Sequence, residues 1–271
     1  MGIKKIISNT NLPNTLESLK KDLFHLGVEP EMVILVHSSL SKIGWINGGA
    51  VTLILALQEV LTKEGTLIMP SHSADLSDPK DWTQPAVPED WWEIIKETMP
   101  PFDQIHTPTF EIGVVPEVFR NFRSVVRSNH PTCSFAAWGK KADKIIEKHS
   151  LDHGFGDKSP LNKIFSQNGH ILLIGVTHES NTSLHLAEEK CRQYPQEKKR
   201  SPIYNEKGER EWKNYKQACY STEFFNTIGN EFEKKHVFKR GKIGNAESKL
   251  INQRELIHFA HQWLDEKINN N

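Results

Sequence analysis

The chain has few cysteines, no long apolar runs and no excess of charge of either sign, and each absence excludes a class of protein. Its 271 residues include three cysteines without C-x-x-C spacing, which argues against a disulfide framework or zinc ribbon and favours a reducing cytoplasm. No apolar run approaches the roughly 18 residues of a membrane span, so we expect a soluble, unprocessed chain without a membrane partner. The 34 basic and 34 acidic residues cancel, which gives no support for a nucleic-acid partner.

The sequence also lacks the common signatures of phosphate, nucleophile and zinc sites. Neither G-x-G-x-x-G nor G-x-x-x-x-G-K-[ST] occurs, which removes the main support for nucleotide hydrolysis and dinucleotide redox chemistry. A G-x-S-x-G elbow is absent, and Cys133 lies in an apolar setting typical of a buried, inert thiol. His178 and Glu179 would need a histidine at position 182 to complete H-E-x-x-H, but Thr182 stands there. We therefore predict neither a metal site nor a serine hydrolase.

Apolar periodicity predicts an α/β fold. Three runs, at 32–36, 66–69 and 170–175, have strand length and suit strands buried on both faces. A helix over 51–61 separates the first two runs, and such a crossover implies parallel pairing. Because we find no internal repeat or linker, the pattern favours one domain over 1–271, with a mostly parallel central sheet covered by helices.

Helix-start signals and turn residues place the remaining elements. A capping-box pattern of Asn14 and Glu17 precedes a helix over 15–26, and one of Asn252 and Glu255 precedes the last helix. A helix opens at Ser159 and Pro160. We expect further helices near 113–121, 142–148 and 221–235, strands near 124–127 and 134–138, a hairpin of 201–204 with 210–215, and a short strand or loop through 241–244.

Regularity falls away between 70 and 110, where prolines, tryptophans and acidic residues gather. A stretch this long without regular structure is usually functional, so we interpret it as a lobe on the substrate side of a site, with a short helix near 90–98.

The most informative feature is a helix that opens at His185 and carries Glu188, after the strand 170–175 and a polar turn. Residues three apart on a helix are neighbours, so the Glu188 carboxylate can hold one imidazole nitrogen while the other faces a cleft. A strand followed by a polar loop and a helix also places these groups at the carboxyl edge of a sheet, where such folds bind ligands. The pair is thus a candidate general base with its orienting group, although His/Glu pairs also occur by chance on solvated helices.

A second candidate is a segment of hydroxyls and glycines before the helix over 51–61. His37, Ser38, Ser39 and Leu40 are followed by glycines at 44, 48 and 49, so exposed amides there could receive a pyrophosphate. Glycines before helices are common, and the pattern alone does not decide the matter.

Five segments, in order, carry a resemblance to a known family. The chain resembles the aminoglycoside N3-acetyltransferases of the antibiotic NAT superfamily, distinct from the GNAT fold, and looks closest to the Bacillus-type branch, in which 88–92 has counterparts. The resemblance implies a three-layer α/β sandwich of the aminoglycoside 3-N-acetyltransferase type. The matching segments are 36–49, 65–71, 127–131, 154–161 and 180–188.

The resemblance also implies a reaction, the transfer of acetyl from acetyl-CoA to the 3-amino group of a 2-deoxystreptamine ring, without a metal. His185 and Glu188 match the family's catalytic base and its orienter, and an amine that is mostly ammonium at neutral pH needs such a base. Amides or hydroxyls near Ser71 and Ser73 are candidate donors to the thioester oxygen. By analogy, the coenzyme contacts are His37, Ser38, Ser39, Leu40, Ser71, Ser73, Arg127 and Ser128.

A polycationic acceptor predicts carboxylates in its pocket. Glu179 stands where many relatives carry aspartate, and the pair of Asp157 and Lys158 replaces a loop that is often less basic, so the identity of the antibiotic stays open. The expected acceptor residues are Asp75, Asp78, Asp157, Glu179 and Asn181.

Two other functions remain open at this point. One is an acetyl-CoA-dependent transferase for a different amine, because fold and donor do not fix the acceptor. The other is a coenzyme A-binding protein without turnover. The sequence also leaves open whether the chain is a monomer or a homodimer.

Overall fold

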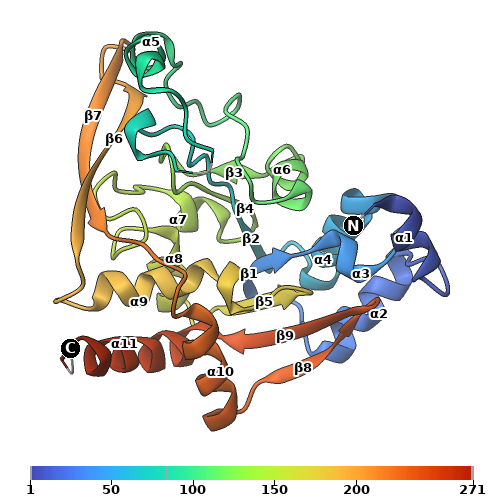
Figure 1. Cartoon of the computed structure of the whole chain (residues 1–271). Coiled ribbons are helices and arrows are strands. Elements are labelled where there is room, and N and C mark those ends of the chain that lie inside the picture. Colours follow the sequence, from blue (N-terminus) through green and yellow to red (C-terminus); the bar gives the residue numbers. More distant parts are fainter. Residues whose placement is uncertain (1, 84, 270–271) are drawn as a thin grey trace.

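A seven-stranded sheet runs through the middle of the molecule (Figure 1). The structure, a computed structural model, describes residues 2–83 and 85–269. In spatial order the strands are β3 (Val126–Arg127), β4 (Phe135–Gly139), β2 (Thr66–Pro70), β1 (Val33–Ser38), β5 (His170–Ile174), β9 (Ala246–Asn252) and β8 (Lys239–Ile243).

Parallel pairing is confined to the centre of this sheet. Strands β2 and β5 both pair with β1 in parallel, as the crossover through α4 (Gly49–Leu61) predicts. The remaining pairings are antiparallel, so the sheet is mixed rather than parallel throughout. Strands β8 and β9 are joined by a tight turn at Gly244, whose φ of 55° suits glycine, and the second of these strands was not expected from the sequence.

Helices cover both faces of the sheet, which confirms the three-layer α/β sandwich. Alternate residues of each central strand enter opposite cores: Ile34 and Val36 pack into one, and Val33 and Leu35 into the other. The first core is completed by α2 (Leu16–Leu26), α4 and α6 (Val114–Arg120). The second is completed by α7 (Ala142–Ile146), α8 (Pro160–Ser166), α9 (His185–Lys190), α10 (Phe225–Lys235) and α11 (Gln253–Asn269).

The helix-start predictions are partly correct. The Ser159 hydroxyl accepts from the Asn162 amide, and Asn252 accepts from the Glu255 amide, as expected. The capping box of α2 is formed by Thr15 and Ser18, not by Asn14 and Glu17. The prediction was wrong because the Asn14 side chain donates instead to the main chain near α3 (Leu40–Ile43), at the oxygens of Ile43 and Trp45.

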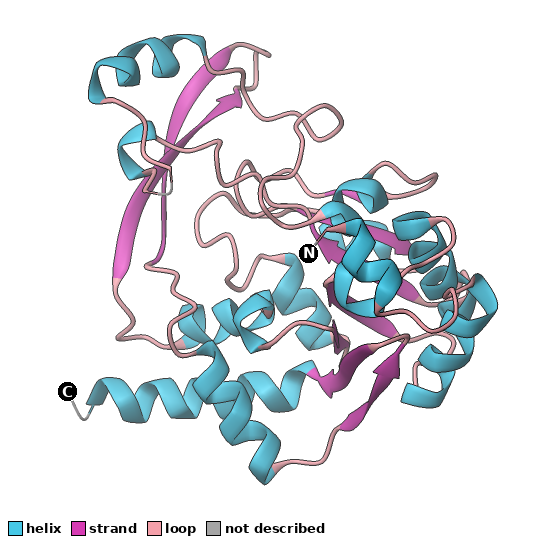
Figure 2. Cartoon of the chain, turned by 45° about the vertical axis from the view of Figure 1, so that its right-hand side comes forward, coloured by secondary structure: helices cyan, strands magenta, loops and turns pink. Residues whose placement is uncertain are grey.

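The irregular segment 70–110 forms a lobe together with a long hairpin of β6 (Gln196–Tyr204) and β7 (Arg210–Ala218), as Figures 1 and 2 show. The lobe carries two short 3-10 turns, η1 (Pro79–Asp81) and η2 (Glu89–Trp91), and α5 (Trp92–Thr98), close to the helix expected at 90–98. The Trp212 indole donates to the Lys96 oxygen at 2.8 Å, and Phe102 donates to the Pro202 oxygen at 3.1 Å.

A further short helix, α1 (Ile3–Ser8), lies near the amino end, on the right in Figure 1. Among the described residues, no helix is both long enough and apolar enough to cross a bilayer.

Candidate functional site

Three neighbouring parallel strands bring histidines to one edge of the sheet. His37 lies at the end of β1, His72 follows the end of β2, and β5 leads through two 3-10 turns, η3 (His178–Ser180) and η4 (Thr182–Leu184), to His185 at the start of α9. Carboxyl ends of parallel strands meet at one edge, and there all three imidazoles line a cavity of about 270 Å³. Its other lining residues include Ser38, Glu111, Ile112, Glu179, Thr182 and Phe225.

The predicted contact between His185 and Glu188 is present. His185 Nδ1 lies 2.6 Å from Glu188 Oε2, the His185 side chain is 13% exposed, and that of Glu188 is 2% exposed. Because Glu188 occupies Nδ1, the nitrogen left for an incoming group is Nε2. The other carboxylate oxygen accepts from the Tyr194 hydroxyl at 2.7 Å and from the Ser221 amide at 3.2 Å. These partners fix the carboxylate, and the carboxylate in turn fixes the ring.

Aromatic side chains surround the His185 ring. Phe155 stacks on it with centroids 4.9 Å apart and an interplanar angle of 8°, while Tyr220 and Phe225 lie at 5.0 and 4.8 Å. Sequence reasoning missed this enclosure, because its members come from the loop before α8, the segment after β7 and the start of α10. Phe155 therefore packs on the face of the His185 ring and the other two rings pack against it at an angle, while His185 still lines the cavity.

His37 is buried and His72 is half-buried, and three of their ring nitrogens are buried without a partner. His37 Nε2 and both ring nitrogens of His72 have no hydrogen-bond partner in the protein. Burial lowers the pKa of His37 to about 3 and that of His72 well below its usual value, and His185 nearby adds to both shifts. Both rings are therefore neutral at physiological pH.

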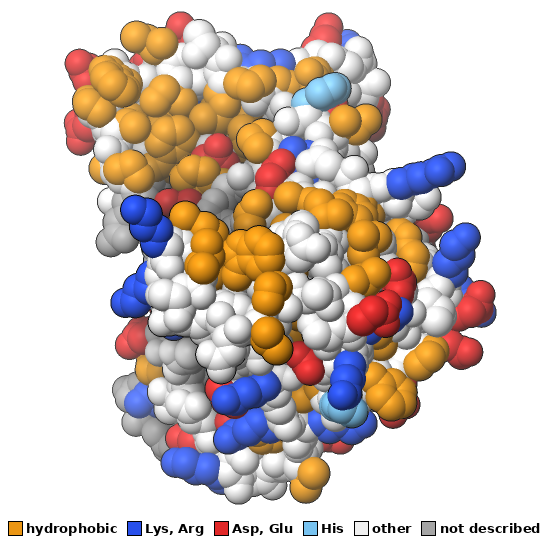
Figure 3. Space-filling view, turned by 90° about the vertical axis from the view of Figure 1, so that its right-hand side faces the viewer, with side chains coloured by type: hydrophobic (Ala, Val, Ile, Leu, Met, Phe, Trp, Pro, Cys, Tyr) orange, Lys and Arg blue, Asp and Glu red, His pale blue; other side chains and the backbone are white. Residues whose placement is uncertain are grey.

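A second, larger cavity of about 690 Å³ adjoins the first, since Ser38 and Ile112 line both. Ser39, Leu40 and Trp45 line it, with Gly49 at the amino end of α4. Hydrophobic side chains gather in the middle of this face of the molecule, the face of α1 and α3 (Figure 3). Four of the residues expected to contact a coenzyme, 37–40, thus lie on the two adjoining cavities.

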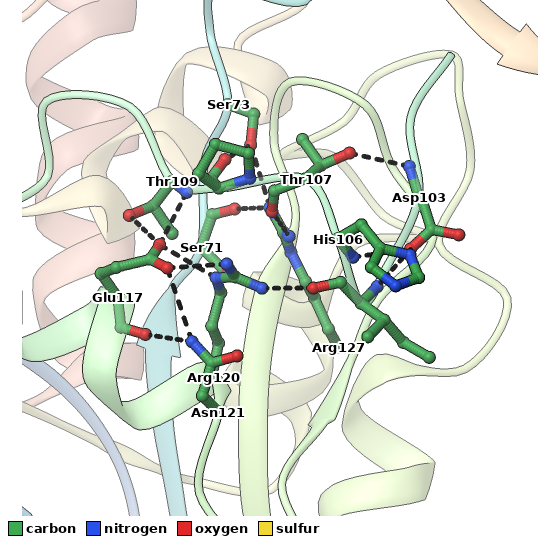
Figure 4. A network of polar contacts seen from close by, with 12 residues as sticks. Ser71, Ser73, Asp103, His106, Thr107, Thr109, Glu117, Arg120, Asn121 and Arg127 are labelled. Carbon is green, nitrogen blue, oxygen red and sulfur yellow. Dashed lines mark hydrogen bonds and ion pairs between the residues drawn. The ribbon is translucent and has the colours of Figure 1, made fainter. Parts of the chain in front are cut away.

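The structure does not bring the other four expected coenzyme residues to these cavities. The Arg127 side chain is buried and donates to the Ser71 oxygen at 2.6 Å, the Ser73 hydroxyl at 2.9 Å and the Thr107 oxygen at 2.5 Å (Figure 4). Ser128 accepts from the Phe135 amide at 2.9 Å. We therefore expect no phosphate contact from Arg127, whose guanidinium binds the protein's own loops.

The amides of Ser71 and Ser73 are not free to bind a thioester oxygen either. They donate to the main-chain oxygens of Ser134 and Thr132, at 2.8 and 3.3 Å. The Ser73 hydroxyl donates to the Pro108 oxygen at 2.6 Å. The Ser71 hydroxyl is buried without a partner, but neither Ser71 nor Ser73 lines the smaller cavity. The geometry therefore supports neither of the two amides, nor the Ser73 hydroxyl, as the expected donor.

Of the five expected acceptor residues, Glu179 alone lines the smaller cavity, and its side chain is exposed. Asp75 lies in the loop after β2 and keeps one buried oxygen without a partner, and burial raises the pKa of its carboxyl group. The other three lie elsewhere: Asp78 is buried against Arg200 at 2.5 Å, Asn181 is buried and caps the turn at Ser183, and Asp157 pairs with Lys190 on a separate groove. Glu111 lines the smaller cavity and was not foreseen.

Within the described ranges, no group of three or more His, Cys, Asp or Glu side chains is placed to hold a metal ion. Cys133 is a buried, free thiol, as expected, and burial raises its pKa to about 12.

Comparison with known proteins gives consistent matches. The family model for aminoglycoside 3-N-acetyltransferase matches residues 35–265. The aminoglycoside N(3')-acetyltransferase-like protein YokD of Bacillus subtilis is 45% identical over 97% of this chain and 96% of its own length. The crystal structure of YokD has a TM-score of 0.97 and covers 99% of each chain.

More distant relatives agree. Aminoglycoside N(3)-acetyltransferase IX of Micromonospora chalcea is 29% identical over 97% of this chain and 98% of that protein. AAC-IIIb, solved as a binary complex with CoASH, is 28% identical with a TM-score of 0.83, over 94% of this chain and 98% of that chain.

Proposed function

The chain belongs to the aminoglycoside 3-N-acetyltransferase family, and from this membership we propose that it moves acetyl from acetyl-CoA to the 3-amino group of a 2-deoxystreptamine antibiotic. Its named relatives are acyltransferases, and the chain is one too. We also propose the cytoplasm as its compartment, since the three cysteines are free thiols.

The pair of His185 and Glu188 supports this proposal most directly. Acetyl-CoA and the ammonium form of the acceptor give the amide, CoASH and one proton. The nitrogen must lose one proton before its lone pair attacks the thioester carbon, and a second once the new bond has formed. His185 Nε2 takes one proton at a time, while Nδ1–H donates to Glu188 at 2.6 Å; the first proton leaves to solvent and the second goes to the departing thiolate. The carboxylate keeps the ring in this tautomer and balances the imidazolium that forms.

The two adjoining cavities offer places for the donor. AAC-IIIb was solved with CoASH, and in this chain the 690 Å³ cavity suits the apolar and amide parts of a pantetheine arm. An arm that passed from this cavity to the smaller one by way of Ser38, which lines both, would bring the acyl sulfur to His185, with His37, Ser39 and Leu40 along the way. We retain these four residues as the proposed coenzyme contacts.

Acidic side chains support a cationic acceptor. Glu111 and Glu179 line the cavity of His185, and Asp75 belongs to the loop that follows β2. Carboxylates near a closed reaction cavity attract a polyamine and hold its other ammonium groups by hydrogen bonds. We propose these three carboxylates, rather than Asp78, Asn181 and Asp157, as the acceptor contacts.

A coenzyme-release assay over a panel of amines tests the proposed function. Purified protein, acetyl-CoA and kanamycin-like or gentamicin-like substrates should release free thiol with saturation in both substrates, and the product should carry one acetyl group at the 3-amine. Saturation by simple amines alone would assign the chain to another acceptor. Acetyl-CoA binding without thiol release from any amine would contradict an enzymatic role.

Glu188→Gln should lower kcat by about 10- to 100-fold, less than removal of the imidazole, with little change in either KM. The amide leaves the ring in place but cannot balance its positive charge, and its NH₂ group would face donors at Ser221 or His185. Glu189→Gln is a matched control, because the neighbouring carboxylate is also buried but binds His153 and Tyr220 rather than His185. Equal kcat in wild type and Glu188→Gln would show that the contact of Glu188 with His185 is structural and has no role in catalysis.

A further inference from the structure

The proposed reaction assigns no role to the imidazole of His72, which lines the same cavity as His185. Strand β2 ends at Pro70 and pairs in parallel with β1, so the chain leaves the sheet beside His37 and on the same edge as the loop to His185. All three imidazoles therefore line one small cavity, each from a different strand.

Two aromatic side chains pack against the His72 ring. It packs edge-on against Phe135, with centroids 5.1 Å apart, and against Phe155, at 5.3 Å. Phe155 in turn stacks on His185, so one aromatic ring separates and positions both imidazoles. The main-chain oxygen of His72 accepts from the Phe110 amide at 2.8 Å, which fixes the loop itself.

Neither ring nitrogen of His72 has a partner in the protein, and both are buried. Because burial keeps the ring neutral, one nitrogen carries a hydrogen and the other a lone pair. A buried N–H group without an acceptor lowers the stability of the folded protein. Because this group belongs to a residue that lines a cavity, we expect a bound ligand to supply the acceptor.

The reaction needs such a donor. When the amine attacks, the carbonyl electron pair moves onto the thioester oxygen, and this charge must be stabilised. The described residues that line the cavity include no lysine or arginine. The amides of Ser71 and Ser73 are already used by Ser134 and Thr132.

We propose that the His72 N–H donates a hydrogen bond to the thioester oxygen of the bound acyl donor and stabilises its negative charge during transfer. The proposal rests on the proposed function. The amine nitrogen, after it has lost one proton to solvent, forms the new bond to carbon, and the carbonyl pair moves to oxygen, where His72 holds it. The nitrogen's second proton passes to His185. The pair then returns as the carbon–sulfur bond breaks, and the thiolate takes that proton from the His185 imidazolium and leaves as CoASH. A neutral donor suits this task, because it gives its proton to neither oxygen nor sulfur.

A pair of variants tests this role. His72→Phe removes the donor but fills the same space, and should lower kcat by about 100- to 1000-fold. His72→Gln keeps an N–H and should recover at least tenfold of that loss. The Kd of CoASH, which has no acyl oxygen, should stay within about threefold of wild type in both variants. Since His72 is neutral throughout, the pH profile of kcat/KM should keep its shape in His72→Gln and fall only in height.

The outcomes separate the inference from the function it rests on. A kcat of His72→Phe within threefold of wild type, or an effect on the KM of the aminoglycoside alone, overturns the role of His72 and leaves the transferase intact. A changed CoASH Kd together with equal kcat losses in both variants indicates a structural role and also overturns it. If wild type releases no thiol with any aminoglycoside, the proposed function is wrong, and so is the role of His72 as hydrogen-bond donor to the thioester oxygen.

Discussion

His185→Ala is expected to lower kcat for thiol release by about two to four powers of ten. The variant removes the proposed base, and the remaining imidazoles of the cavity are poor replacements because burial holds them neutral. The Kd of acetyl-CoA should change little, because the proposed role of His185 is to act on the acceptor nitrogen, at the far end of the proposed coenzyme path. The measurement is steady-state kinetics beside calorimetric titration of acetyl-CoA.

The chain contains a matched control for this variant. His153 pairs with Glu189 at 2.7 Å, much as His185 pairs with Glu188, but its side chain is 45% exposed and lies on the separate groove of Asp157. His153→Ala should keep at least half of the wild-type kcat. Comparable losses in His153→Ala and His185→Ala, or unchanged turnover in His185→Ala, would rule out His185 as the base.

Arg127→Met is expected to destabilise the protein by about 3 kcal/mol or more, because each hydrogen bond from a charged donor contributes about 1.5–3 kcal/mol. The guanidinium binds three other segments of the chain: the Ser71 oxygen and Ser73 hydroxyl in the first and the Thr107 oxygen in the second (Figure 4), and the Ser134 hydroxyl in the third. Burial lowers its pKa to about 10, which still leaves it charged at neutral pH. At about 2–4 °C per kcal/mol, the melting temperature should fall by roughly 6–12 °C.

Arg123→Met is the control for this variant, since Arg123 is an exposed arginine of the same segment. Its free energy of unfolding should stay within about 0.5 kcal/mol of wild type. If Arg127→Met melted at the wild-type temperature but bound acetyl-CoA more weakly, the structural role of Arg127 would be wrong. Arg127 would then be a phosphate contact, as the sequence predicts.

The sequence predicts the centre of the fold well because buried strands and amphipathic helices leave strong periodic patterns. Strands β1, β2 and β5 and helix α4 were expected nearly at their observed bounds. The contact of His185 with Glu188 was also predictable, since it depends only on the spacing of two residues on one helix.

The rest of the site depends on contacts between distant segments, which local patterns do not encode. Arg127 has a residue type that suits phosphate, but its partners Ser71 and Thr107 are 56 and 20 residues away along the chain. His72 lies directly after an expected strand, and that position was a usable signal. Only the folded structure reveals that its nitrogens are buried and unpaired.

The contacts between segment 70–110 and the hairpin of β6 and β7 join parts of the chain that the ribosome makes at different times. Asp78 is buried against Arg200, 122 residues further along the chain, and Lys96 binds Trp212 across 116 residues. At about 5–20 residues per second, the partner of Asp78 is made some 6–24 s after Asp78 itself. During that interval the Asp78 carboxylate lacks Arg200, and the Lys96 oxygen lacks the Trp212 indole. The contacts between the lobe and the hairpin can therefore form only after the ribosome has passed residue 212.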